Sequence, residues 1–304
     1  MPEPSRTAVA TGSAAAWLLA VRPKTLPAAA SGVVVATVLA WRDGAFALGP
    51  ALAALAIAVL LQVASNLAND VYDDERGADT PDRLGPTRVT NAGLLSRTQV
   101  KTGLKIALAV AFALGVYLTF VRGWFVLVIG LAAMVSAVAY TGGPYPLGYH
   151  GLGEVFVFTF FGVACVAGTY WVQSGSVTPA VWLMTVPPGL IITAILVVNN
   201  LRDVEQDRRV GKRTLAVRLG VGATRAEWVA CVAGAYVVVT AGVAAGLLPP
   251  HALAAWLSVP LALVTGRTVL REAGRPLNAA LARTGMLALV FALLFAAGVV
   301  AAGR

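Results

Sequence analysis

Nine apolar segments run through this chain of 304 residues, and most of them approach the roughly 20 residues that a helix needs to cross a bilayer. They cover residues 25–41, 48–69, 102–121, 124–141, 153–173, 178–198, 224–247, 251–270 and 280–302. Hydrophobic residues make up 58% of the chain and charged residues 12%, which excludes an ordinary soluble protein. The sequence predicts an all-α, polytopic membrane protein with nine transmembrane helices. We expect one domain over residues 1–304, with residues 1–14 as a disordered cytoplasmic tail.

The densest run of acid in the sequence comes directly after an apolar stretch. Residues 51–65 are typical of the inside of a membrane helix, and within one more turn the chain changes to Asp70, Asp73, Asp74, Glu75, Asp79 and Asp82. If the helix continues, Asn66, Asp70 and the pair Asp73/Asp74 project from one face. Carboxylates crowded in this way repel one another unless a cation lies between them.

A second acidic run repeats the spacing of the first. Asn199, Asp203 and Asp207 match Asn66, Asp70 and Asp74, each displaced by 133 positions. The repeat indicates a duplicated half-molecule whose two sites face each other. Oxygen ligands of this kind suit Mg²⁺, which proteins usually hold with one or two carboxylates plus substrate phosphates. The alternative is a pair of acidic helix ends solvated at the membrane surface.

The basic residues predict the orientation of the chain. If the nine segments alternate in direction, all but three of the 23 Lys and Arg residues (Arg42, Arg122 and Arg304) fall on the side of the N-terminus. The positive-inside rule makes that side cytoplasmic, so both acidic runs face the cytoplasm. We therefore expect a multi-pass protein of the cell inner (plasma) membrane. The basic residues share their loops with acids instead of forming a separate patch, which argues against a nucleic-acid partner.

Several cations lie near the acidic runs. Lys24, with Arg22, is either a flanking charge or an anion contact at the mouth of the site. Arg88, in a loop with two glycines and a proline, either neutralises the aspartates or binds phosphate. Lys212 follows Asp207 closely, as a metal–diphosphate site needs.

The loop between the fourth and fifth segments has a different composition. It carries Tyr140, Tyr145 and Tyr149 among glycines and prolines, with no Lys or Arg. These tyrosines are either part of an interfacial aromatic belt or a lid that presents aromatic faces to a planar or cationic ligand.

The two acidic motifs resemble those of a known family. N-D-x-x-D at 69–73 and D-x-x-x-D at 203–207 are similar to the motifs of the intramembrane aromatic prenyltransferases, the UbiA superfamily. NLANDVYDDERGADTPDRLGP, YTGGPYPLGYHGLGE, NNLRDVEQDRRVGKRTLAVRLG and the earlier RPKTLPAA resemble the menaquinone-pathway branch of that family. The likeness extends from about Arg22 to Gly220.

The resemblance implies nine helices around a central cavity open to lipid, and Mg²⁺ as the cofactor. It implies that a polyprenyl diphosphate and 1,4-dihydroxy-2-naphthoate are joined, with loss of carbon dioxide and diphosphate, to give demethylmenaquinone. The expected catalytic residues are Asp70, Asp73, Asp203 and Asp207. The expected metal ligands are Asp70, Asp73, Asp74, Asp79, Asp203 and Asp207. The expected substrate-binding residues are Asn66, Arg88, Lys24, Tyr140, Tyr145, Tyr149, Asn199 and Lys212.

One departure from the family pattern concerns the loop with the three tyrosines. Other members have Y-x-x-x-K there, whereas here Tyr145 is followed four places later by Tyr149. Arg88 and Lys212 are the candidates for the missing phosphate contact, and the departure argues against a benzoate-type acceptor. Two alternatives stay open: another aromatic or tetrapyrrole prenyltransferase, and a cation transporter with carboxylates in a duplicated bundle.

Overall fold

The computed structural model describes residues 9–77 and 84–303, and every regular element among them is a helix. This confirms the all-α prediction. The elements are α1 (Ala14–Val21), a 3-10 turn (Pro23–Thr25), α2 (Leu26–Arg42), α3 (Leu48–Glu75), α4 (Arg97–Arg122), α5 (Phe125–Ala139), a 3-10 turn (Leu147–His150), α6 (Gly153–Val157), a π-helix (Phe158–Ala167), α7 (Gly168–Ser174), α8 (Pro179–Met184), α9 (Val186–Arg209), α10 (Leu215–Ala244), a 3-10 segment (Pro250–Ser258), α11 (Val259–Arg271) and α12 (Leu277–Ala301).

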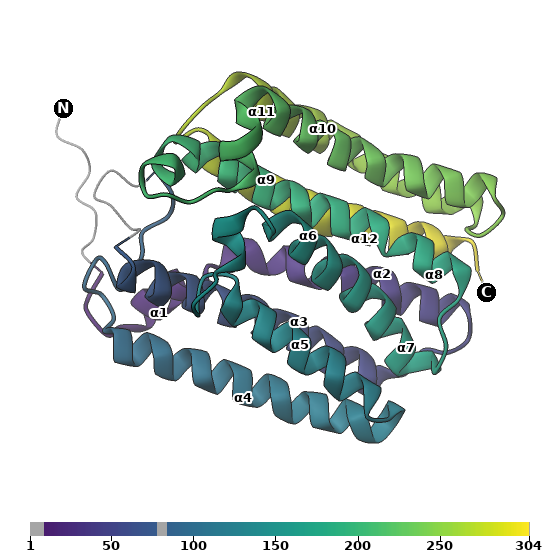
Figure 1. The fold of residues 1–304 in the computed structure, drawn as a ribbon. Coiled ribbons are helices and arrows are strands. Elements are labelled where there is room, and N and C mark those ends of the chain that lie inside the picture. Colours follow the sequence, from purple (N-terminus) through teal and green to yellow (C-terminus); the bar gives the residue numbers. More distant parts are fainter. Residues whose placement is uncertain (1–8, 78–83, 304) are drawn as a thin grey trace.

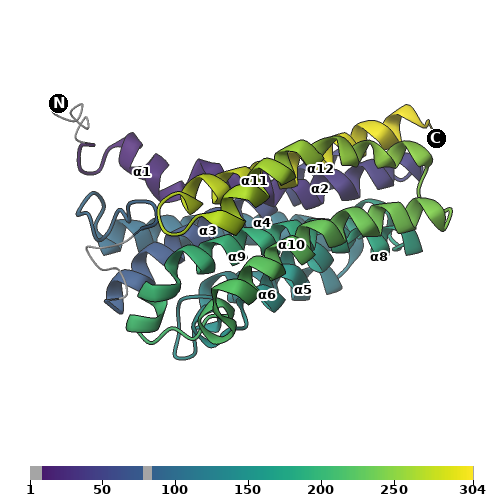
Figure 2. The ribbon, with the colours of Figure 1, turned by 90° about the horizontal axis from the view of Figure 1, so that it is seen from above.

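Within those ranges, eight helical stretches are long and apolar enough to cross a membrane. A ninth apolar helix, α5, is shorter at 15 residues. Figures 1 and 2 show the long helices running along one common axis, with successive helices alternating in direction. The helices α3 and α9 continue through the acidic runs to Glu75 and Arg209. Both ends lie on the side of the bundle where α1 lies (Figure 1), so the fold brings the two acidic runs to the same end.

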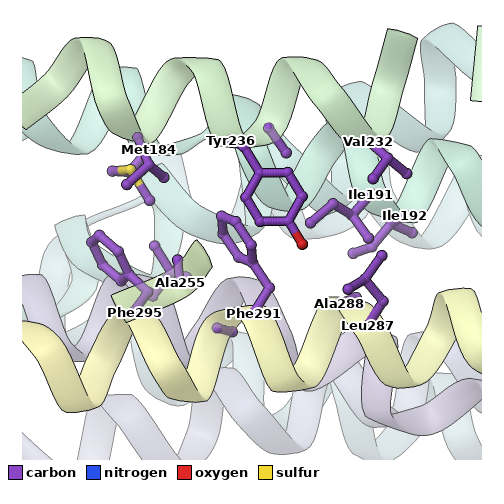
Figure 3. Packing of buried hydrophobic residues seen from close by; sticks show 14 of the residues in the cluster. Met184, Ile191, Ile192, Val232, Tyr236, Ala255, Leu287, Ala288, Phe291 and Phe295 are labelled. Atoms are coloured by element: carbon purple, nitrogen blue, oxygen red, sulfur yellow. The ribbon is translucent and has the colours of Figure 1, made fainter. Parts of the chain in front are cut away.

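A large buried hydrophobic cluster joins α2 to the helices of the C-terminal half. Tyr236 of α10 packs edge-on against Phe291 of α12, with ring centroids 5.5 Å apart, and its hydroxyl is 2.7 Å from the Ser258 hydroxyl. Phe295 and Met184 are also fully buried there (Figure 3). Pairing the hydroxyl matters because an unpaired polar group in such an interior is costly. This half of the protein therefore supplies a rigid frame for α9.

The helices on the other side of the bundle pack more loosely. α5 packs on α3 and α4, yet none of its residues is fully buried. The π-helix Phe158–Ala167 crosses α9 closely, because a Cβ at Gly162 would lie 2.9 Å from the Cα of Gly189. A π-helix is rare and often marks a functional site. Space for a ligand is thus left beside α5 and not within the C-terminal core.

The chain is ordered before the first long helix. The Gly12 N–H donates to the Leu94 carbonyl (2.9 Å), and the Ser13 side chain caps α1. These bonds hold Gly12 and Ser13, which belong to the tail expected over residues 1–14, against the rest of the chain. Residues 1–8 lie outside the described part, so the disordered tail stays a prediction. α1 and α2 are separated at Arg22, which has a left-handed backbone (φ 54°) before Pro23.

Candidate active site

Two adjoining spaces lie at and below the acidic end of the bundle. We call the first the polar chamber; it is lined by Asn69, Asp73, Arg88, Tyr140, Thr141, Gly148, Tyr149, Asn199, Asn200, Asp203, Gln206, Asp207, Lys212 and Thr214. The second, the apolar cavity, has a volume of about 380 Å³ and is lined mainly by α2 to α5, the π-helix, α7 and α9. Four residues line both spaces: Asn69, Arg88, Tyr140 and Asn199. A ligand with a polar head and an apolar tail would pass between them.

The two halves meet in a different register from the one that the sequence suggested. Asn69 and Asp73 of α3 face Asn199, Asp203 and Asp207 of α9 across the polar chamber. These residues match at a displacement of 130 positions, not 133, and position 77, which would pair with Asp207, is a glycine. The expected triplet Asn66, Asp70 and Asp74 does not line the chamber.

The three residues of that triplet have other contacts. Asn66 lines the apolar cavity, and its amide donates to the Val21 carbonyl (2.9 Å) and to the Thr25 hydroxyl (3.0 Å). The Asp74 carboxylate pairs with Arg97 (2.6 Å). Asp70 is buried and accepts hydrogen bonds from the loop that follows α3. The structure thus places these three residues outside the polar chamber, and their expected roles as metal ligands or substrate contacts stay predictions; Asp79 lies outside the described residues.

Asp73 is the most heavily contacted acid in the chamber. Its carboxylate pairs with Arg88 (2.8 Å), accepts a hydrogen bond from the Tyr149 hydroxyl (2.8 Å) and lies 3.4 Å from Lys212 Nζ. The same ammonium lies 4.4 Å from the centroid of the Tyr149 ring, a favourable cation–π geometry. Burial raises the pKa of Tyr149, and the Asp73 charge raises it further, so the phenol stays protonated and donates.

On α9, Asp203 has its own cation. The Arg202 guanidinium binds the Asp203 carboxylate through two nitrogens, and it also donates to Asn199 and Asn278 (both 2.8 Å). Asp207 is buried one turn further on, and its carbonyl accepts the Lys212 N–H (2.9 Å). This bond turns the chain back at the end of α9, which places Lys212 between the two acidic helix ends.

The model of the UbiA prenyltransferase family matches residues 26–282. This chain belongs to that family. The 1,4-dihydroxy-2-naphthoate octaprenyltransferase of Escherichia coli is 39% identical, covering 93% of this chain and 94% of that protein. The protein of the same name from Mycobacterium tuberculosis is 38% identical over 96% of this chain and 99% of its own length. The family assignment confirms the resemblance inferred from the motifs.

Solved structures show the same fold for this UbiA family protein. A UbiA homolog from Aeropyrum pernix has a TM-score of 0.68 at 19% identity, over 93% of this chain and 97% of that one. A homolog from Archaeoglobus fulgidus, bound to GPP and Mg²⁺, has a TM-score of 0.58 at 15% identity, over 94% and 99% of the two chains. These similarities confirm the fold and leave the roles of individual residues to the geometry.

The donor set of the polar chamber fits Mg²⁺. Asn69, Asp73, Asn199, Asp203 and Asp207 offer only oxygen ligands, the type that this hard cation prefers. Within residues 9–77 and 84–303, no three acidic, His or Cys side chains gather closely enough to hold a metal by themselves.

The remaining expected substrate-binding residues divide into two groups. Tyr140, Tyr149, Asn199, Arg88 and Lys212 line the chamber, whereas Lys24 is exposed and Tyr145, 57% exposed, stacks on His150 outside it. Sequence reasoning missed Asn69 and Arg202 as residues that line or brace these two spaces, whereas Arg22 was considered with Lys24 as an anion contact. Asn69 precedes Asp73 by four positions, as Asn199 precedes Asp203, and this was the signal that could have found it. Arg22 instead of Lys24 lines the apolar cavity, 4.0 Å from Asp70.

Proposed function

We propose that this enzyme transfers a polyprenyl group from a polyprenyl diphosphate to 1,4-dihydroxy-2-naphthoate. Carbon dioxide and diphosphate leave, and the product is the quinol form of demethylmenaquinone. The observation that carries the proposal is the polar chamber, rich in acids and cations, that opens directly into the apolar cavity. The names of several relatives at 34–39% identity support the acceptor.

In the proposed complex the diphosphate occupies the polar chamber and the prenyl tail occupies the apolar cavity. Arg88 and Lys212 bind the diphosphate oxygens, and they take the phosphate contact for which other family members use a loop lysine. Asn69, Asp73, Asn199, Asp203 and Asp207 would hold Mg²⁺, which when bound stabilises negative charge on the departing diphosphate. The Tyr149 ring and hydroxyl orient Lys212 and Asp73 toward each other.

The reacting carbon would lie at the junction of the two spaces. Arg88 and Tyr140 line both, so the allylic carbon–oxygen bond breaks beside a fixed cation and above an apolar enclosure. The walls of the cavity, among them Phe156 and Phe160, exclude water that would otherwise quench the allylic cation. Arg22, at the same end of the cavity, offers a guanidinium for the acceptor's carboxylate. Loss of that carboxylate restores the aromatic ring without a strong base.

The function is tested by product analysis. Purified protein is incubated with Mg²⁺, geranylgeranyl or a longer polyprenyl diphosphate, and dihydroxynaphthoate, and the products are identified by mass spectrometry. We expect a decarboxylated prenyl naphthoquinol, and no product with 4-hydroxybenzoate as the acceptor. Prenylation of 4-hydroxybenzoate alone would overturn the proposed acceptor, and no prenylation with any aromatic acceptor would overturn the proposed reaction.

The cavity predicts a change in chain-length preference. Gly130 of α5 lines the apolar cavity, and no heavy atom lies within 4 Å of a Cβ added there. A leucine at this position would extend into the space of the prenyl tail, where overpacking costs about 1–3 kcal/mol. Gly130→Leu should therefore lower transfer from octaprenyl diphosphate by about tenfold or more, and leave geranyl diphosphate nearly unaffected. If Gly130→Leu changes the transfer rates from both diphosphates by the same factor relative to wild type, the prenyl tail lies elsewhere.

We also propose that the chamber faces the cytoplasm and that the protein resides in the cell membrane. In intact cells, Asn91→Cys in the loop after α3 and Arg209→Cys at the end of α9 should resist a membrane-impermeant thiol reagent until the cells are permeabilised. Ser176→Cys, in the loop between α7 and α8 at the opposite end, is the matched control and should react at once. Labelling of position 91 or 209 from outside would reverse the orientation.

A further inference from the structure

The Asp70 carboxylate accepts three hydrogen bonds from the loop that follows α3. Oδ2 accepts the Val89 N–H (3.0 Å), and Oδ1 accepts the Thr90 N–H (3.0 Å). The Thr90 hydroxyl lies within hydrogen-bond distance of Oδ1 and of the Asp70 carbonyl. A carboxylate has about four lone-pair sites, so these donors take most of its capacity. Arg22 Nη2 lies 4.0 Å away, and Asp70 is only 1% exposed.

The bonded loop is the segment that delivers Arg88 to the polar chamber. Val89 is fully buried in a cluster with Val71 and Leu95, and its carbonyl accepts the Leu94 N–H (2.9 Å). With the backbone of residues 89 and 90 held on α3, the buried Arg88 side chain turns back to Asp73 (2.8 Å). Asp70 and Asp73, three residues apart on one helix, thus contact the two ends of the same short segment.

We propose that Asp70 is a positioning residue that acts through Arg88 and does not join the acids that bind the cation. Its charge fixes the backbone at Val89 and Thr90, and this places the guanidinium at the junction of chamber and cavity. The predicted effect on the rate of transfer rests on the proposed function, whereas the anchoring of the loop is inferred from the contacts alone.

The second half of the molecule supports this division of tasks. In the 130-residue register Asp70 corresponds to Asn200, which directly follows the chamber residue Asn199 as Asp70 follows Asn69. The buried Asn200 amide donates to the Glu154 carboxylate (2.9 Å) at the start of α6. In both halves, the first residue of the pair lines the junction and the second bonds to a neighbouring segment of the chain, although Asn200 also lines the chamber and Asp70 does not.

The test compares Asp70→Asn and Thr90→Val with Asp73→Asn in the full-length protein. In Asp70→Asn an amide NH₂ has to face a backbone N–H, and Thr90→Val keeps the shape of the side chain but removes the hydroxyl. Hydrogen exchange of residues 84–94 is measured in excess chelator. The Mg²⁺ concentration for half-maximal activity, kcat and the KM for the diphosphate are measured separately. Thr90→Ser, which keeps the hydroxyl, is the conservative control.

We expect Asp70→Asn and Thr90→Val each to speed exchange of the amides at 89 and 90 and to lower kcat/KM by about tenfold to a hundredfold, without moving the Mg²⁺ half-saturation. Thr90→Ser should behave as wild type, and Asp73→Asn should shift the Mg²⁺ requirement. If Asp70→Asn shifts the Mg²⁺ concentration for half-maximal activity but leaves hydrogen exchange unchanged, Asp70 is one of the acids that bind the cation. Unchanged hydrogen exchange at residues 89 and 90 in both Asp70→Asn and Thr90→Val would also overturn the proposed anchoring of the loop by Asp70. If the wild type proves inactive as a prenyltransferase, the exchange data still decide the anchoring, so the two failures are distinguishable.

Discussion

Asp73→Asn and Asp203→Asn are each expected to lower prenyl transfer by about a thousandfold while the protein stays folded. Each change removes one carboxylate charge from the polar chamber and keeps the shape of the side chain. Because both acids would act on one diphosphate complex, the double variant should lose much less than the sum of the two single losses. Initial rates under saturating substrates and thermal stability in detergent are measured for all three.

Asp74→Asn is the matched control for this prediction. Asp74 neighbours Asp73 but pairs with Arg97, whose side chain is 57% exposed. An exposed pair of this kind contributes at most about 1 kcal/mol, so the variant should keep transfer within about tenfold of wild type. A large loss of prenyl transfer in Asp74→Asn, together with normal transfer by Asp73→Asn, would show that the acids of the 133-residue register form the site. Activity losses that follow losses of thermal stability would assign both acids a structural role.

Removal of divalent cations is expected to abolish prenyl transfer, and addition of Mg²⁺ to restore it. Asp73, Asp203 and Asp207 lie around the position proposed for the diphosphate, and without a bound cation their charges repel it. The loss should exceed about a hundredfold, since removal of even one electrostatic stabiliser can cost this much. Thermal stability in chelator serves as the control, because Arg88, Lys212 and Arg202 already pair with the acids and should keep the fold intact. Full turnover in excess chelator would exclude a metal-dependent reaction.

The positions of the transmembrane helices and of the acidic helix ends could be predicted from the sequence. Apolar length alone determines where a chain can cross a bilayer, and the observed helices follow the expected segments closely. The continuation of α3 and α9 through the acidic runs follows from the absence of Gly or Pro between residue 51 and Glu75 and between residue 190 and Arg209. Lys212 was also identified from its distance to Asp207.

Which acids face each other was decided by tertiary structure. The displacements of 133 and 130 positions differ by three residues. Three residues of an α-helix turn through about 300°, so the side chains chosen by the two registers point in directions only about 60° apart. Pattern matching favoured the longer displacement because it aligned three polar residues, although the packing of α3 against the loop at 88–90 turns Asn69 and Asp73 inward instead. Hydropathy and spacing carry no information on that rotation. The amino-acid sequence by itself determined the bundle, its acidic end and the residue types of the site. Tertiary structure decided which of those residues meet, because the contacts of Arg88, Val89 and Thr90 with one face of α3 form only when separate segments pack together.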